Sequence, residues 1–153
     1  MKYTCYSNAC ASGCKRRAAS VPDYGPEPAC FNIEYLTDLN TNFRTTIWTG
    51  EHLQVTLMNI NPGEDIGLEI HNDFDQFLRI ENGLGLVKMG SSPSNMCYQA
   101  EVCEGNAILV PAGTYHNLIN LADVPLKLYS IYAPPAHRPG TVHETKEEAE
   151  KEH

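Results

Sequence analysis

The sequence is poor in positive charge. Its 153 residues include 11 Lys and Arg against 19 Asp and Glu, which gives a formal net charge of -8 at pH 7. Nucleic acid and anionic lipid surfaces attract proteins through Lys and Arg, so this balance argues against both as partners. The one basic cluster, KRR at residues 15–17, is too short to change that expectation.

Long hydrophobic runs are also missing. No stretch approaches the roughly 18 apolar residues that a transmembrane helix requires. The N-terminal residues MKYTCYSNACASGC contain no apolar run after their lysine, so they do not resemble a secretory signal. We therefore expect a cytoplasmic protein with no membrane partner, whose 42% hydrophobic residues suffice for the core of one domain.

The six cysteines lack the paired C-x2-C spacing of a zinc finger. Cys97 and Cys103 are expected to be small, half-buried residues of strands or loops. The other four lie in the first 30 residues, and we expect them to be reduced thiols on a loose arm: Cys5, Cys10, Cys14 and Cys30.

What the sequence does contain is a series of short runs rich in β-branched and aromatic residues. They begin at about Phe31 and read FRTTIWTG, HLQVTLMNI, FLRIENGLGLVKM, NAILVPAG and PLKLYSIYA, with turn-forming segments such as NPGED and GSSPSN between them. This pattern predicts an antiparallel sandwich or barrel, with no amphipathic helix of useful length before Pro135. We divide the chain into an irregular N-terminal arm (1–30), a β-barrel (31–135) and a tail (136–153).

The tail is predicted to end in a short, frayed and solvent-exposed helix. Thr145 and Glu148 have the spacing of a capping box, which marks a helix N-terminus. The residues around them are mostly Glu and Lys, so the helix has almost no apolar face to bury.

Polar side chains interrupt two of the apolar stretches. In GLEIHNDFDQFLRIENGLG, Glu69 and His71 lie two residues apart and so share one face of a strand. NDFD predicts a turn, and a hairpin through it would place Gln76 opposite that pair. The second stretch, GNAILVPAGTYHNLIN, carries His116 just after a turn. Buried polar groups need partners, so a cation would explain why the four converge.

These residues resemble the two motifs of the cupin family, a group of small double-stranded β-helix (jelly-roll) proteins. The first motif, G-x5-H-x-H-x(3,4)-E-x6-G, is matched in spacing at Gly63, Glu69, His71, Gln76 and Gly83. The second, G-x5-P-x-G-x2-H-x3-N, is matched at Gly105, Pro111, Gly113, His116 and Asn120. The resemblance covers roughly residues 50–135, and it implies an all-β jelly-roll barrel.

The resemblance also implies a metal-ligand set, with two departures from the family pattern. Glu69 replaces a histidine and Gln76 replaces a glutamate, but both replacements are oxygen donors. The implied ligands of a divalent ion (Zn, Mn, Fe, Co or Ni) are Glu69, His71, Gln76 and His116. A hydrogen-bonded polar cluster without a metal is the alternative. Asp75 is either a carboxylate partner of a ligand imidazole or a simple turn residue.

A metal is the one evident source of reactivity, because the sequence has no G-x-S-x-G motif and no phosphate loop. The ligand content is similar to that of phosphomannose-isomerase-type cupins, which implies an isomerase or epimerase acting on a small carbohydrate-like molecule such as a sugar phosphate. Two alternatives stay open: an iron-dependent dioxygenase, and a non-catalytic module that binds a small-molecule ligand. No catalytic residue is assigned. Because unpaired sheet edges need covering, we expect a homodimer.

Overall fold

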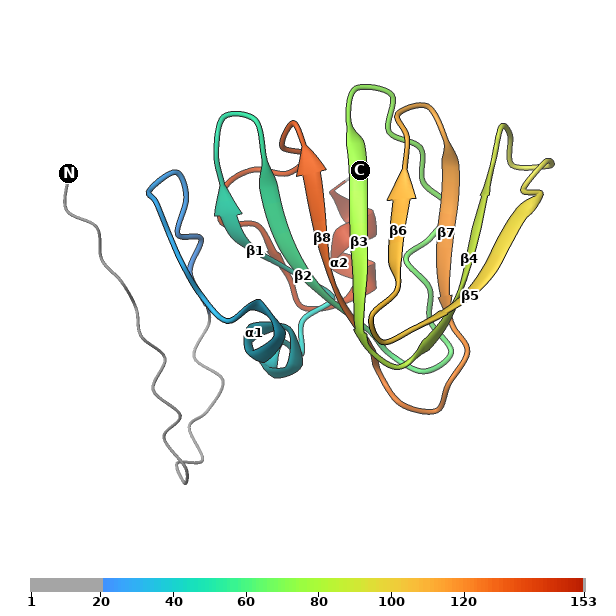
Figure 1. Ribbon diagram of the computed structural model, residues 1–153, viewed down its shortest axis with the longest axis horizontal. Coiled ribbons are helices and arrows are strands. Elements are labelled where there is room, and N and C mark those ends of the chain that lie inside the picture. Colours follow the sequence, from blue (N-terminus) through green and yellow to red (C-terminus); the bar gives the residue numbers. More distant parts are fainter. Residues whose placement is uncertain (1–20, 153) are drawn as a thin grey trace.

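The computed structural model describes residues 21–152, which form two antiparallel β-sheets with short helices (Figure 1). In chain order the elements are α1 (Ile33–Leu39), β1 (Arg44–Thr49), β2 (Gln54–Ile60), β3 (Asp75–Asn82), β4 (Leu84–Gly90), β5 (Tyr98–Cys103), β6 (Ala107–Val110), β7 (Tyr115–Asn120), β8 (Leu126–Ala133), β9 (Val142–His143) and α2 (Lys146–Lys151). The larger sheet has the strand order β6-β3-β8-β2-β1-β9, and the smaller one has the order β5-β4-β7. The all-β jelly-roll expectation is confirmed.

The main core lies between the two sheets, where the alternating apolar residues of the strands meet. In β8 the pattern is regular, with every second residue buried from Leu126 to Tyr132. This alternation is what a strand with one face on the core requires. The core cluster comprises Phe43, Met58, Ile60, Ile66, Leu78, Ile80, Val87, Val102, Ile108, Val110, Leu118, Leu126, Leu128 and Ala149.

A second, smaller core covers the outer face of the larger sheet. Helix α1 lies beside β1 and β2 there (Figure 1), and its Leu36 packs with Ile47, Val55 and Leu57. Because both faces of β2 are covered, all seven of its residues are buried. This explains why the run HLQVTLMNI shows no clear polar face.

Three elements were not predicted from the sequence: α1, β5 and the two-residue strand β9. Helix α1 is only seven residues long and is held by its ends: the Asn32 side chain accepts from Tyr35 N, and Lys127 Nζ donates to the carbonyls of Asp38 and Asn40. Such capping depends on a lysine about 90 residues away, which no local pattern reveals. Strand β5 was missed because it is an edge strand with only Val102 buried, so its sequence lacks a hydrophobic alternation.

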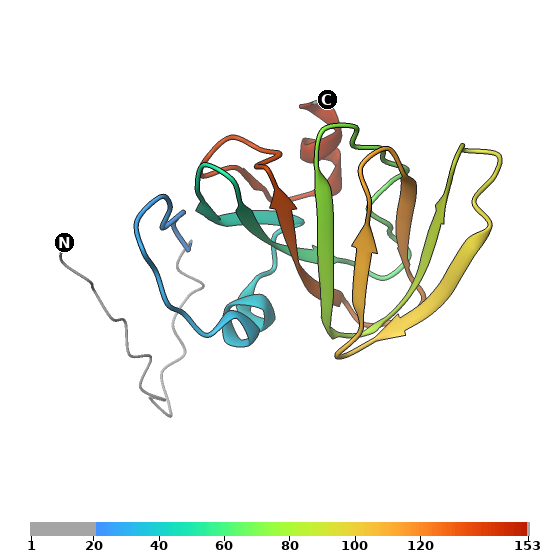
Figure 2. The same ribbon diagram turned by 45° about the horizontal axis from the view of Figure 1, so that its top comes forward.

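The C-terminal helix was predicted correctly in position but wrongly in exposure. Thr145 caps α2 by accepting from Glu148 N, as expected. However, Ala149 is buried in the main core, and Lys146 forms an ion pair with Asp65 in the loop before β3. A single small side chain is therefore enough to dock α2 against one end of the barrel (Figure 2).

The described part of the N-terminal arm, residues 21–30, runs along β1. Tyr24 N donates to the carbonyl of Ile47, and Trp48 Nε1 donates to the carbonyl of Glu27. Cys30 is exposed; Cys97 and Cys103 are exposed rather than half-buried, because they flank and end the edge strand β5. The three earlier cysteines (Cys5, Cys10 and Cys14) lie outside the described residues. Neither helix within residues 21–152 has the length and apolar composition needed to cross a bilayer.

Candidate metal centre

Backbone pairing between two distant segments brings Glu69 and His116 together. Each donates its N–H to the other's carbonyl, at 2.9 Å in both directions, in an isolated antiparallel bridge. Directly paired residues project to the same face, so both side chains enter the space between the sheets. His71 follows two residues later on that face and is fixed by a bond from Gly113 N to its carbonyl, 2.7 Å.

The predicted hairpin between this segment and β3 is therefore wrong. Strand β3 pairs with β6 and β8, in the larger sheet, whereas Glu69 pairs with β7 in the smaller one. The NDFD turn carries the chain from one sheet to the other instead of back along itself. Gln76 consequently faces Glu69 and His71 across the barrel and not as their neighbour in one hairpin.

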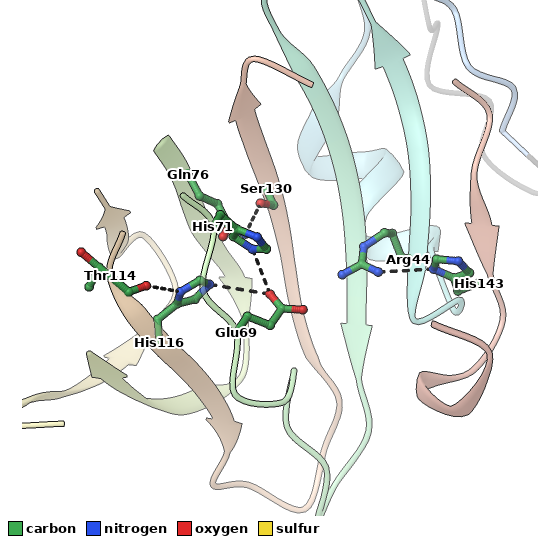
Figure 3. Close-up of polar contacts among 8 residues, drawn as sticks. All are labelled: Arg44, Glu69, His71, Gln76, Thr114, His116, Ser130 and His143. Carbon is green, nitrogen blue, oxygen red and sulfur yellow. Dashed lines mark hydrogen bonds and ion pairs between the residues drawn. The ribbon is translucent and has the colours of Figure 1, made fainter. Parts of the chain in front are cut away.

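Three of the four predicted ligands converge. Oε2 of Glu69 lies 3.3 Å from Nε2 of His71 and 3.7 Å from Nε2 of His116 (Figure 3). One ligand atom from each residue falls within 4.8 Å of the other two. Nitrogen and oxygen ligands sit at about 2.1 Å from an ion such as zinc, so they lie roughly 3–4 Å from one another. The spacing of this cluster is suited to one bound ion.

The orientation of the His116 ring favours a ligand role. Its Nδ1 lies 3.1 Å from the carbonyl of Thr114, which can only accept, so Nδ1 donates there and Nε2 is the ring nitrogen that faces the centre. His116 is 2% exposed, and its Nε2 has no hydrogen-bond partner among residues 21–152. A buried ring nitrogen without a partner is costly, and a metal ion at this point would remove that cost.

Glu69 is held in its charged form. Burial on its own would raise the pKa of this carboxyl, but contacts with the imidazoles of His116 and His71 and the positive charge of Arg44 outweigh it. The pKa of Glu69 therefore lies well below its ordinary value. An ionised carboxylate is the form in which Glu binds a metal.

Gln76 is also available as a donor. It is 4% exposed, and its Nε2 donates to Oγ of Ser130 at 2.9 Å, a bond that orients the amide. Its Oε1 is buried and has no partner within the part of the chain that the structure describes. After Nε2 of His116, this is a second buried atom at the centre without a hydrogen-bond partner among the described residues. It is consistent with the prediction that Gln76 is the fourth ligand.

Several residues near the centre were not predicted. Phe74 stacks on the ring of His71 with 4.5 Å between centroids, and the ring of Tyr132 meets His71 edge-on at 6.2 Å. Burial raises the pKa of the Tyr132 phenol, so it stays protonated. Arg44 reaches the centre from β1. The contacts of Phe74, Tyr132 and Arg44 join distant segments, so local sequence patterns do not predict them. The aromatic residues in NDFD and SIYAPP are the one local indication of a ring near the centre.

Asp75 and two histidines of the C-terminal tail take structural positions. Asp75 Oδ1 accepts from Ala112 N at 2.8 Å, so it is a turn residue and not the partner of a ligand imidazole. The ligand imidazole of His116 has the carbonyl of Thr114 as its partner instead. His143, which is only 2% exposed, lies beside Arg44, and His137 packs edge-on against Tyr132.

The fold and this cluster can now be compared with known proteins. The model of the cupin domain family matches residues 56–132, which include the centre. The chain belongs to the cupin family. Its resemblance at the two motifs is thus confirmed at the level of the family.

This cupin is similar to several known proteins. It is 61% identical over 127 residues to the uncharacterized protein YrkC of Bacillus subtilis, covering 83% of this chain and 68% of the relative. The uncharacterized protein L612 of Acanthamoeba polyphaga mimivirus is 40% identical over 112 residues, covering 72% of this chain and 68% of L612. The crystal structure of BH2720 from Bacillus halodurans superposes with a TM-score of 0.85 at 60% identity, covering 86% of this chain and 99% of BH2720.

Proposed function

We propose that this cupin binds one divalent metal ion through Glu69, His71 and His116, with the amide oxygen of Gln76 as the fourth donor. The observation that carries the proposal is the buried Nε2 of His116, which has no hydrogen-bond partner within residues 21–152 and faces Oε2 of Glu69 at 3.7 Å. Two imidazoles with a carboxylate and an amide oxygen suit Zn, Mn, Fe, Co or Ni.

We further propose that the site takes a small polar, carbohydrate-like molecule and acts on it as an isomerase or epimerase. A bound divalent ion supplies Lewis acidity and open positions for adjacent oxygen atoms of such a molecule. The chain itself supplies the aromatic rings of Phe74 and Tyr132 beside His71, which would shield one side of a bound molecule from water. The support for this reaction class is the ligand content, which matches that of phosphomannose-isomerase-type cupins.

An iron-dependent dioxygenase is the second candidate. Its specific support is the convergence of two imidazoles and one carboxylate within 4.8 Å, the ligand set of the two-histidine, one-carboxylate oxygenases. The two candidates differ in what they consume. An isomerase exchanges a carbon-bound proton with solvent, whereas a dioxygenase consumes oxygen.

One experiment distinguishes the candidates. Metal-free protein is loaded in turn with Zn, Mn, Fe, Co and Ni, and a panel of aldoses, ketoses and their phosphates is incubated with each form in D2O. Deuterium entering the carbon next to the carbonyl, seen by NMR and absent in His116→Ala, supports an isomerase. Oxygen uptake by the iron form alone supports the dioxygenase. Retention of a sugar without either change supports the binding module and refutes both reactions.

We also propose that the chain forms a homodimer. The support is the unpaired outer edges of β5 and β6, which expose Tyr98 and Leu109 at 58% and 66% beside a groove of about 400 Å³. Light scattering during gel filtration should give twice the chain mass, and Leu109→Lys should reduce it to one chain. A parent protein that elutes with the mass of one chain would refute the dimer.

A further inference from the structure

Arg44 is an unusual residue for a barrel interior. It is 2% exposed, which makes it the one fully buried Lys or Arg between residues 21 and 152. Its Nη1 lies 3.3 Å from Nδ1 of His143, but its Nε has no hydrogen-bond partner in the described range. A buried guanidinium with an unsatisfied donor is costly, so it calls for a partner that the described residues do not provide.

The guanidinium is oriented toward the metal centre. In Figure 3 it lies between His143 and Glu69, with one nitrogen directed to each side. Arg44 and Glu69 line the same small cavity of about 20 Å³ beside α2, which contributes Lys146, Ala149 and Glu150 to its wall. A space of this size holds about one water molecule or one ligand oxygen atom. Arg44 therefore has both a free donor and a small space beside it.

His143 fixes the orientation of Arg44. Because guanidinium nitrogens only donate, Nδ1 of His143 accepts from Arg44, and Nε2 carries the proton toward Oε2 of Glu152 at 2.7 Å. This chain of contacts holds the guanidinium from the side away from the metal centre. Tyr132 also forms a hydrogen bond with Arg44, and Nε is the donor that is left for a ligand among residues 21–152.

The charges of the centre indicate what that ligand is. Without a metal, the cation of Arg44 and the carboxylate of Glu69 balance each other. A divalent ion bound by Glu69 and neutral imidazoles leaves an excess of two positive charges in the barrel. Unbalanced buried charge is strongly unfavourable, so the loaded site favours an anion.

We propose that Arg44 is an anion anchor, and that the ligand of this site is a small carboxylate with a hydroxyl or carbonyl oxygen on the adjacent carbon. The carboxylate lies against the Nε side of the guanidinium, which matches its planar, two-oxygen geometry. The adjacent oxygen lies on the metal held by Glu69, His71 and His116. The inference rests on the proposed metal site and names the ligand class for it. A cavity of about 20 Å³ fits one carboxylate oxygen better than a tetrahedral phosphate.

Three matched probes test the anchor in the cobalt-loaded protein by its visible absorption spectrum. Glycolate carries both features, acetate only the carboxylate, and ethylene glycol only the hydroxyl. We expect glycolate to shift the spectrum at the lowest concentration. Arg44→Met should raise the Kd for glycolate roughly 10- to 100-fold, the range for losing a charged hydrogen bond. Arg44→Lys should raise this Kd roughly tenfold, because lysine keeps the charge but lacks the paired donors of a planar guanidinium. Arg138→Gln removes one exposed charge and should leave the Kd unchanged.

The results separate this inference from the metal proposal. Cobalt uptake followed by equal binding of glycolate and ethylene glycol overturns the anchor and leaves the metal site standing. An unchanged glycolate Kd in folded Arg44→Met likewise overturns the anchor without affecting the metal site. Should Arg44→Met fail to fold, Arg44→Lys and the three probes on the parent decide. A parent protein that takes up no cobalt contradicts the metal site, and the anchor with it.

Discussion

Glu69→Gln is the substitution whose effect follows most directly from the geometry. The change keeps the shape of the side chain but removes its charge. In the metal-free protein that charge faces the imidazole of His71 at 3.3 Å and lies within reach of the buried Arg44. Its removal leaves the guanidinium, 2% exposed, without a counter-charge in the barrel.

The size of the effect can be estimated from burial. Removing one partner of a fully buried ion pair costs about 3–5 kcal/mol, which is an upper bound here because Arg44 acts on Glu69 through its charge and not in a direct ion pair. The Glu69 side chain retains 19% exposure, so water screens part of the interaction. We therefore expect the free energy of unfolding of the metal-free protein to fall by roughly 2–3 kcal/mol. Metal affinity should fall by at least roughly 100-fold, since even indirect partners of metal ligands are worth 10- to 100-fold.

Urea unfolding followed by circular dichroism, with a chelator present, measures the free energy of unfolding of the metal-free parent and of Glu69→Gln. The exposed Glu101→Gln serves as the control and should stay within about 0.5 kcal/mol of the parent. Because the pKa of Glu69 is lowered in the folded protein, its contribution is fully present above the ordinary value of 4.5 and is lost as the pH falls toward the folded value. The difference between parent and variant should thus be constant near pH 7 and shrink in acid. A difference below about 0.5 kcal/mol at pH 7 would refute the assigned charge balance.

Three further substitutions test other parts of the account. Gln76→Leu should lower metal affinity about tenfold, measured by competition with a chelating dye, and an unchanged affinity would remove Gln76 from the ligand set. Asn120→Ala removes three hydrogen bonds to the backbone and should lower the free energy of unfolding by about 2–3 kcal/mol in urea; a loss below about 1 kcal/mol would mean that these bonds contribute little. Asp65→Asn should speed amide hydrogen exchange in α2, because it breaks the ion pair with Lys146. Burial alone would raise the pKa of Asp65, but the hydrogen bonds from Asn117 and Lys146 lower it. The stabilisation by the ionised Asp65 is therefore present above pH 3.8 and is lost as the pH falls. Exchange equal to that of the parent at pH 7 would contradict the docking role.

Residues with a fixed local spacing were predictable. The turn after β6 requires a left-handed residue, and Gly113 supplies it with a φ of 78°, which returns the chain so that His116 enters β7. This geometry depends on neighbouring residues, so the second motif predicts it. The same holds for Thr145 and Glu148 at the start of α2.

Features that depend on distant segments were not predictable. Glu69 pairs with His116 through the backbone, 47 residues apart, whereas local reasoning placed Glu69 in a hairpin with β3. Arg44 lies in a strand that reads as an ordinary run of Thr and aromatic residues, and its role depends on β9 and the 67–71 segment. Sequence reasoning found the cluster that could hold a metal ion but missed Arg44, the residue proposed to bind an anion.

Metal analysis of protein purified without added metal tests the central claim most directly. The account predicts about one equivalent of a divalent metal per chain for the parent, since one set of ligands is present, and almost none for the double variant His71→Ala, His116→Ala. Equal metal content in the parent and the double variant would contradict it.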